Sequence, residues 1–498
     1  MAWPNPFARR DEYTRTAWGY TFQLTPGHLT LEKSHPLKHS YDTLGEECLT
    51  ILNQISPPET PGLRPTSSPA TITTDLKPDP SLPPTSHPPP PKSTSKPKRD
   101  LYAHLLQHKS NHPALEHLYT TACTPPFPVD WDQMVRGQDV FYRYAGPSLT
   151  GLAYQSLLGG MGAARVVETL ARTGGFNTKV ARHRLFETTQ FILECTRDLE
   201  SIRPGGDGFA SALRVRLLHA AVRKRILGLE EKYPGYYSVE ENGVPINDLD
   251  CIATIGTFSA TLLYLSLPRQ GIWVTRQEEV DYIALWRLIA WYTGTPTEWF
   301  ETPERAKMVM ESLLLNEIRP SKTSGVLANN IIRALENTPP AYASRSFLLA
   351  NTRWLNGHEL CDALELGRPG MVYYALTVGQ CLFFMGVCYF YRQFEGLDRW
   401  KVQAARKVFW EFIVENKYGL GGEKAVFEMK YVPDLGVGTE KDGGSEVKSG
   451  IMGVEGRSAR ALVVGVLGLG GVVWGLVKVV AGVWTMGRWA VEAALSMR

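Results

Sequence analysis

One histidine of this chain lies in a setting that suits a metal or cofactor ligand. His219 belongs to the run LRVRLLHAAVR, which contains neither Gly nor Pro and is rich in helix-forming residues. In a helix, Val215, His219, Val222 and Ile226 fall on one stripe, because they are spaced by four, three and four residues. The imidazole is then expected to point inward among apolar residues, where its ring nitrogens need partners. That partner is either a metal ion or, as in an ordinary protein core, a backbone carbonyl or a carboxylate. The spacing alone favours the carbonyl or carboxylate.

A second group of polar residues precedes this histidine. Arg184 and Thr188 are one helical turn apart in the run RLFET, and Glu168 lies on the preceding helical segment, before a Gly-Gly break. If the two helices pack antiparallel, Glu168, Arg184 and Thr188 are expected to meet inside. An inward arginine needs an acid, and either Glu168 or Glu187 would serve. On spacing alone, a structural ion pair between helices is the favoured alternative.

The elements that must position these residues are predicted to be helices. Helical patterns dominate residues 100–430, and runs of alternating β-branched residues are few. We therefore expect an all-α protein whose body is a single large helical domain over 100–430. Within it, residues 375–391 are apolar nearly all round. They are interpreted as a central buried helix, with a membrane span as the alternative.

The flanking segments differ from this body in composition. Residues 1–56 form an N-terminal segment that is partly helical, with one helix expected near 41–55. Residues 57–99 are predicted to be a disordered linker, because 14 of the 34 prolines lie between 57 and 97 and apolar residues are too few to offset the entropy of ordering. Residues 431–460, rich in Gly, Lys and Glu, are interpreted as a flexible tether.

The segment after the tether, residues 461–487, is a candidate transmembrane or membrane-associated helix. Its first 17 residues, 461–477, carry no charge, and a span needs roughly 20 mostly apolar residues. Lys478 interrupts it, Arg457 and Arg460 precede it, and Arg488 follows it. A buried or surface-lying amphipathic helix is the alternative. The predicted location is a membrane, with the endoplasmic reticulum as the expected one.

Composition excludes several other classes of function. A net charge of +3 with scattered Lys and Arg gives no basis for nucleic-acid binding. The seven cysteines form no CxxC pair, which argues against a zinc finger and against a dense disulfide framework. Neither a phosphate loop nor a Gly-x-Ser-x-Gly nucleophile elbow occurs.

Taken in order, the motifs resemble the latex-clearing rubber oxygenases and the fungal MpaB-type oxygenases that share their domain. The likeness covers roughly residues 130–400. It rests on the order and spacing of several weak motifs: Glu168, RLFET from Arg184, RVRLLHAAVR around His219, GVPINDLD from Gly243, Phe258, the turn at Gly271, the Glu-x-x-x-Tyr-x-x-x-Trp pattern of Glu278–Trp286, and Gly294.

The resemblance implies an all-α core that holds haem b, with His219 as the proximal iron ligand and Glu168, Arg184 and Thr188 in the pocket. Rubber oxygenases carry a lysine just before that threonine, where this chain has Glu187. The expected activity is that of a haem-dependent oxygenase, an oxidoreductase that oxidises or cleaves a C=C bond of a lipophilic, isoprenoid-like substrate with O2.

Glu187 keeps a second interpretation open, a haem-free, membrane-associated helical scaffold or interaction protein of the same fold. A third, a non-haem or hydrolytic enzyme, lacks a recognisable set of ligands or nucleophiles.

Overall fold

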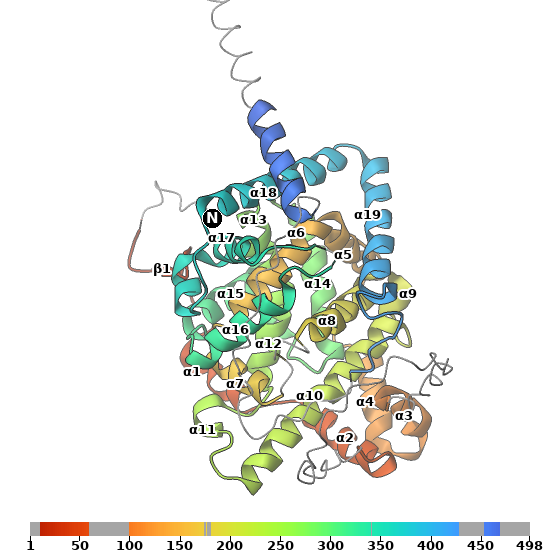
Figure 1. Ribbon diagram of the computed structural model, residues 1–498. Coiled ribbons are helices and arrows are strands. Elements are labelled where there is room, and N and C mark those ends of the chain that lie inside the picture. The colour runs from red at the N-terminus through yellow and green to blue at the C-terminus, as the bar shows by residue number, and fades with distance from the viewer. Residues whose placement is uncertain are drawn as a thin grey trace, which may run out of the picture.

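The computed structural model describes residues 10–58, 99–173, 176, 181–339, 341–427 and 453–468 (Figure 1). Its described part is almost entirely helical, which confirms the all-α prediction. The two strands found there, β1 (Thr14–Ala17) and β2 (Tyr20–Gln23), form one antiparallel hairpin that the sequence patterns did not predict. Trp18 and Gly19 form its turn, both with positive φ (50° and 73°), as a two-residue hairpin turn requires.

Apart from the long segment between α2 and α3, the helices follow one another with short connections. In the N-terminal part they are α1 (Leu31–Ser34), η1 (Pro36–Lys38), α2 (Thr43–Ile55), α3 (Leu101–His108), η2 (Lys109–Asn111) and α4 (Pro113–Cys123). The middle of the chain forms α5 (Trp131–Arg143), α6 (Ala145–Thr150), the π-helical η3 (Gly151–Gly159), α7 (Ala164–Arg172), α8 (Ala181–Thr196), α9 (Leu199–Ile202), α10 (Asp207–Lys232), α11 (Val239–Asn242) and α12 (Asp248–Phe258). The last part forms η4 (Leu262–Ser266), α13 (Leu267–Arg269), α14 (Arg276–Tyr292), η5 (Glu298–Phe300), α15 (Pro303–Asn316), α16 (Lys322–Leu335), α17 (Arg345–Ala363), α18 (Met371–Arg392), α19 (Glu395–Trp410) and η6 (Glu411–Glu415).

Helix α14 is the centre of the largest hydrophobic core. A Thr275–Glu278 capping box starts it, and its Trp286 is fully buried and stacks on Phe258 of α12 with ring centroids 5.0 Å apart. Helix α5 packs closely along it because Gly137 has no side chain: a Cβ there would lie 2.5 Å from the carbonyl oxygen of Asp281. The body around these helices is thus one packed unit.

The N-terminal segment is part of this body. Tyr20 and Phe22 belong to the main core, and Glu311 of α15 accepts hydrogen bonds from Tyr20 Oη (3.0 Å) and pairs with His28 Nε2 (2.9 Å). The helix expected near 41–55 is confirmed as α2, which shares a core with α3, α4 and α10.

The chain leaves this N-terminal part and returns to it at the same place. Arg99 donates hydrogen bonds to Asn53 Oδ1 (2.7 Å) and to the carbonyl of Leu52 (3.4 Å) at the end of α2. Residues 59–98, most of the proline-rich segment, lie outside the described residues. Whatever their conformation, they interrupt one packed unit and do not separate two.

Helix α18 corrects one interpretation. Residues 375–391 lie in it as predicted, but they are not a central buried helix: only 28% of its most apolar 18-residue window is buried. Among the described residues, α18 is the one single helix long and apolar enough to cross a membrane. One bent pair, residues 248–258 with 262–269, passes the same test as a broken span.

A final helix, residues 454–468, rises from the body beside α18 (Figure 1). Residues 454–460, assigned to the flexible tether from the sequence, are already helical, and Val454 N donates to the carbonyl of Ala341 (3.2 Å). The remaining tether, 431–452, and most of the candidate span, from 469 onward, lie outside the described residues.

Candidate functional site

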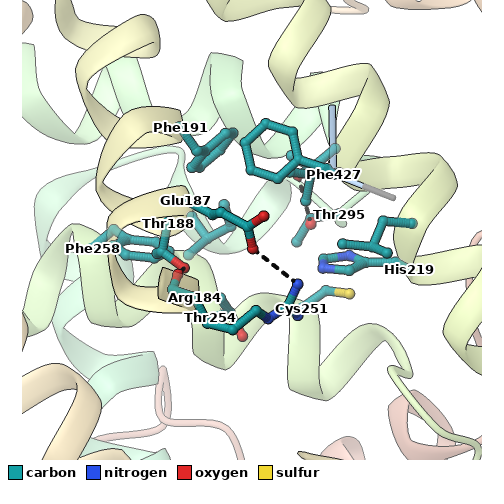
Figure 2. A pocket seen from close by; sticks show the side chains of 14 residues that line it. Arg184, Glu187, Thr188, Phe191, His219, Cys251, Thr254, Phe258, Thr295 and Phe427 are labelled. Carbon is teal, nitrogen blue, oxygen red and sulfur yellow. Dashed lines mark hydrogen bonds and ion pairs between the residues drawn. The ribbon is translucent and has the colours of Figure 1, made fainter. Parts of the chain in front are cut away.

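A cavity lies where α8, α10 and α12 meet. It has a volume of about 170 Å³ and opens outward. Aliphatic and aromatic groups form much of the wall. Figure 2 shows the lining: Arg184, Glu187, Thr188 and Phe191 from α8; Val215, Leu218 and His219 from α10; Cys251, Thr254, Ile255 and Phe258 from α12; and Thr293, Thr295 and Phe427.

His219 reaches the cavity as its helical stripe predicted. Val222 and Ile226 of the same stripe are buried, and Val215 lines the cavity beside the imidazole. Burial lowers the pKa of His219 to about 4, helped by the positive charges of Arg223 and Arg184. The ring is therefore neutral near pH 7, which is the form that binds a metal ion.

The imidazole also has an unsatisfied atom. Its Nδ1 is buried and has no hydrogen-bond partner among the described residues. The carbonyl or carboxylate expected of an ordinary core histidine is thus not found there. Leaving a buried polar atom unpaired costs about 1–3 kcal/mol, so this ring is poised for a ligand.

Arg184 and Glu187 form an ion pair in the cavity wall, and Figure 2 shows the ring of His219 directed toward them. Arg184 Nη1 lies 3.3 Å from Glu187 Oε2, and Glu187 Oε1 lies 3.4 Å from His183 Nε2. Glu187 is 6% exposed, whereas the side chain of His183 is about half exposed. One carboxylate thus links a surface imidazole to a guanidinium inside.

The remaining polar and aromatic lining closes the cavity. Thr188 lies at an exposed position and donates its hydroxyl hydrogen to the carbonyl of Arg184 (3.1 Å).

Phe427 covers another side of the cavity. The segment that carries it is held by Gln190, whose Oε1 accepts a hydrogen bond from Ala425 N at 2.9 Å. Phe427 has a positive φ of 53° and is only 6% exposed. It closes the cavity from a loop and not from a helix.

Glu168 does not join the group with which the sequence placed it. It lies on α7, where its carboxylate pairs with Arg172 Nη1 at 2.6 Å, one turn along the same helix. It is not part of the cavity lining, and about a quarter of its side chain is exposed. The expectation that Glu168, Arg184 and Thr188 meet inside is wrong for Glu168, because an acid on α8 itself, Glu187, already pairs with the arginine.

Helix α10 is also held by the N-terminal segment. Arg216, one turn before His219, is 7% exposed and forms two 2.7 Å hydrogen bonds with the carboxylate of Asp42. Gly294, with φ 73°, passes so close that a Cβ would lie 2.7 Å from Arg216 Nε. Arg216 is not part of the apolar stripe of His219, and the N-terminal segment buries it.

Several residues that line the cavity were not predicted from the sequence. Cys251, Thr254, Thr293, Thr295 and Phe427 carry no motif of their own. A partial signal existed for two groups: GVPINDLD leads directly into Cys251, and Gly294 lies between the two threonines. No such signal existed for Phe427, because this residue follows the last helix of the body and reaches the cavity from a loop.

The described residues hold no group of three or more His, Cys, Asp or Glu side chains that could bind a metal ion. A single histidine does not define a metal site. A metal ion bound by His219 would therefore take its other ligands from outside the described residues, as the iron of a tetrapyrrole does.

Comparison with known proteins agrees with the sequence motifs. The family described as "ER-bound oxygenase mpaB/B'/Rubber oxygenase, catalytic domain" matches residues 142–379. No curated protein matches the chain. One solved structure, titled "Structure of Latex Clearing Protein LCP in the closed state", is 18% identical, covers 60% of this chain and 77% of its own, and superposes with a TM-score of 0.46.

The family match spans α8, α10 and α12, and so includes His219, Arg184, Glu187 and Thr188. Residues 142–379, just under half of the chain, are thus similar to the mpaB/rubber oxygenase catalytic-domain family.

Proposed function

We propose that the protein is a membrane-associated, haem-dependent oxygenase that oxidises or cleaves a C=C bond of a lipophilic, isoprenoid-like substrate with O2. The observation that carries this is the imidazole of His219. It is neutral, borders a largely apolar cavity, has an unpaired ring nitrogen, and faces a guanidinium, a carboxylate and a hydroxyl. The family match supports an oxygenase-type enzyme that acts on a small molecule with O2.

The residues of the cavity fit a haem in their chemistry. His219 would supply the nitrogen ligand, and Phe191, Ile255 and Phe258 would contact the porphyrin ring. Cofactor pockets measure about 300–1,000 Å³, which exceeds the 170 Å³ of this cavity. The cofactor would thus need the open side, where Phe427 is the lining residue that no helix holds.

A bound haem would supply the reducible iron that activates O2. The chain's own residues would bind and orient the reactants. Arg184 can hold a carboxylate of the cofactor through its planar fork of N–H donors. The Thr188 hydroxyl can turn from the Arg184 carbonyl to donate inward. Glu187 can receive a proton at Oε1 from His183 Nε2, which connects the cavity to solvent.

The substrate class follows from the wall of the cavity and from the C-terminal segment. Val215, Leu218, Ile255 and Phe258 favour an apolar chain over a charged one. The apolar residues 461–477 would anchor the enzyme in a membrane, which concentrates such a substrate. Because the family name describes ER-bound oxygenases, we propose the endoplasmic reticulum as that membrane.

The test of this proposal is the visible spectrum of the purified protein with iron analysis. We expect a Soret band with stoichiometric iron, and we expect His219→Ala to lose the band. Adding free imidazole to His219→Ala should restore it, which separates loss of the ligand from loss of the fold. His183→Ala, one turn outside the cavity, is the matched control and should keep the band. A wild-type protein without iron, or a His219→Ala variant with an unchanged band, contradicts the proposal.

A second pair of variants tests which carboxylate takes part in the reaction. The family resemblance points to Glu168, whereas the cavity contains Glu187. We expect Glu187→Gln to lower turnover at least tenfold and to shift its pH profile, with the Soret band kept. Glu168→Gln should change turnover less than twofold. The reverse result would return the role to Glu168 and reduce Glu187 to a structural partner of Arg184.

A haem-free scaffold or interaction protein is the second candidate, because the same cavity also fits a protein without a cofactor. The Arg184–Glu187 ion pair and the small enclosed volume are compatible with a wall that holds no cofactor. Absence of iron and of a Soret band from the protein, after expression with excess haem precursor, would favour this candidate.

A further inference from the structure

Two neighbouring helices present an apolar surface to the outside. On α18, Phe383, Gly386 and Phe390 are exposed, and Phe394 follows them before α19, at spacings of three, four and four residues. The opposite stripe, which includes Thr377, Cys381 and Cys388, is buried. This helix carries no charged residue from 371 to 391. An exposed helix of a soluble protein normally places charges on its outer stripe, so this stripe is unusual.

The surface continues onto α19 and onto the loop before α14. Trp400 is 62% exposed and stacks on Tyr391, with ring centroids 6.2 Å apart. Trp273 is 61% exposed and donates its backbone N–H to Tyr389 Oη at 3.0 Å. We call the exposed side chains of this surface the apolar face; they are Trp273, Phe383, Phe390, Phe394, Leu397, Trp400, Val408 and Phe412.

Helix α18 is fixed to the body along its length. Near its middle, Gln380 donates to Asn351 Oδ1 of α17 at 3.1 Å. At its end, Arg392 donates to Tyr144 Oη at 2.8 Å. A helix tied in this way cannot cross a bilayer unless the charged body beneath it enters as well. Its outer stripe can only meet the surface of an apolar phase.

The C-terminal helix shows which phase this is. It packs on α18 at its base, where a Cβ on Gly379 would collide with the Ser458 carbonyl. It then leaves the body (Figure 1), and Val463, Val464, Val466 and Leu467 are 57–69% exposed. The sequence continues uncharged to Val477, so the helix needs an apolar medium directly beside the apolar face.

Charges border this surface. Arg457 and Arg460 are exposed at the base of the C-terminal helix. On α19, Arg399 and Lys407 are 73% and 77% exposed and pair with Glu395 (3.3 Å) and Glu411 (3.8 Å) of the same helix. Basic residues and tryptophans at the edge of an apolar zone match the headgroup layer of a bilayer, where Trp anchors and Lys or Arg meet phosphate.

We propose that the part of the apolar face on α18 and at the start of α19, as far as Trp400, is a second membrane contact that lies in the headgroup layer of the bilayer that the C-terminal helix enters (Figure 1). The catalytic body is then held flat against the membrane and does not hang from a flexible tether. This inference rests on the proposed function only for the membrane anchor, and it does not depend on haem.

The test uses the full chain with an environment-sensitive nitrobenzoxadiazole dye on a single introduced cysteine. Phe390→Cys and Trp400→Cys report on the apolar face. Glu231→Cys, at the exposed end of α10 on the opposite side of the molecule, is the matched control (Figure 1). Labelled wild type corrects for reaction at the seven native cysteines. Each protein is mixed with phosphatidylcholine vesicles whose acyl chains are either plain or brominated.

We expect the brominated lipid to reduce dye emission at least twofold at positions 390 and 400 and to leave position 231 unchanged. Emission that is equally unaffected at all three positions, while the protein still floats with the vesicles, overturns the proposal and leaves the anchor intact. Failure of the full chain to float overturns both the apolar face and the anchor. The Soret band of the same samples reports separately on the oxygenase proposal.

Discussion

His219 and Asp250 respond to pH in opposite directions, although they lie on neighbouring helices. Burial lowers the pKa of the imidazole to about 4 and raises the pKa of the Asp250 carboxyl to about 6, the latter against the pull of Arg165. Between pH 4 and pH 6, the folded state therefore keeps His219 without its proton and keeps Asp250 protonated. The two contributions to the pH dependence of stability largely cancel.

A variant at His219 separates the two contributions in the cofactor-free protein. An unfolded imidazole binds a proton near pH 6.5 and the folded one only near 4, so the unfolded state holds more protons in this window. The free energy of unfolding contributed by His219 therefore falls as the pH falls from 6.5 to 4, by up to about 3 kcal/mol. Asp250 contributes the opposite slope.

Urea unfolding at pH 7 and pH 4.5 measures this effect. Relative to wild type, His219→Gln should gain stability on acidification, because only the Asp250 contribution remains. Equal pH dependence in the two proteins would show that His219 is not held neutral by its surroundings.

At the residue scale, helical periodicity predicted the inward stripe of His219 and the one-turn spacing of Arg184 and Thr188, because it fixes neighbours on one helix. Only the family resemblance implied that Arg184 and Thr188 lie in the same pocket as His219. The place of Glu168 did not follow, because the choice between an acid one turn away and an acid on another helix depends on packing that periodicity does not contain. Cys251 and Phe427 were missed for the same reason.

At the scale of elements, α10 is buried on two sides and not on one. The cavity and core cover its apolar stripe, while α2 and the loop before it cover the stripe of Arg216 and Arg223, which are 7% and 1% exposed. A sequence pattern with arginines on the second stripe normally indicates a solvated face. The acids that pair with them, Asp42 and Glu46, lie more than 150 residues earlier, so no local pattern reveals them.

The Asp42–Arg216 pair gives a stability prediction. Asp42→Asn retains the side-chain oxygen that caps α2 by accepting from Gly45 N, but it removes the charge. Breaking a buried ion pair costs about 3–5 kcal/mol, because the partner charge stays buried. We expect Asp42→Asn and Arg216→Met each to lower the free energy of unfolding substantially, as followed by circular dichroism in urea.

The double variant tests the cause. With both charges gone, Asp42→Asn/Arg216→Met should be less destabilised than the sum of the two single variants. Additive losses would mean that each residue acts through separate contacts, such as the cap for Asp42.

At the scale of the whole molecule, residues 10–58 and the helical body are one unit, although composition suggests two parts joined by a linker. The proline-rich run was recognisable because composition alone identifies such segments. Whether it separates two bodies or loops out of one depends on where its ends lie. Here Arg99 returns to Asn53 and Leu52, which only a structure can show.

Replacing residues 59–97 by a short Gly-Ser linker should therefore leave the fold unchanged. The flanking residues already touch, and shortening a loop changes its closure entropy by only about 0.6 kcal/mol per halving. The thermal midpoint should stay within a few degrees of wild type, measured by differential scanning fluorimetry. As a control, deleting residues 10–58 should abolish cooperative unfolding, because this removes the partners of Glu311 and Arg216.

The partners of Glu311 and the loop that carries Phe427 also determine the order in which parts of the fold can form during translation. His28 leaves the ribosome long before Glu311 does, and the cavity lacks one wall until Phe427 is made. The amino-terminal hairpin must wait unpaired through most of translation, and no nascent chain shorter than the whole helical domain can enclose a ligand. A ligand of this cavity can therefore be enclosed only after the chain has been made as far as Phe427.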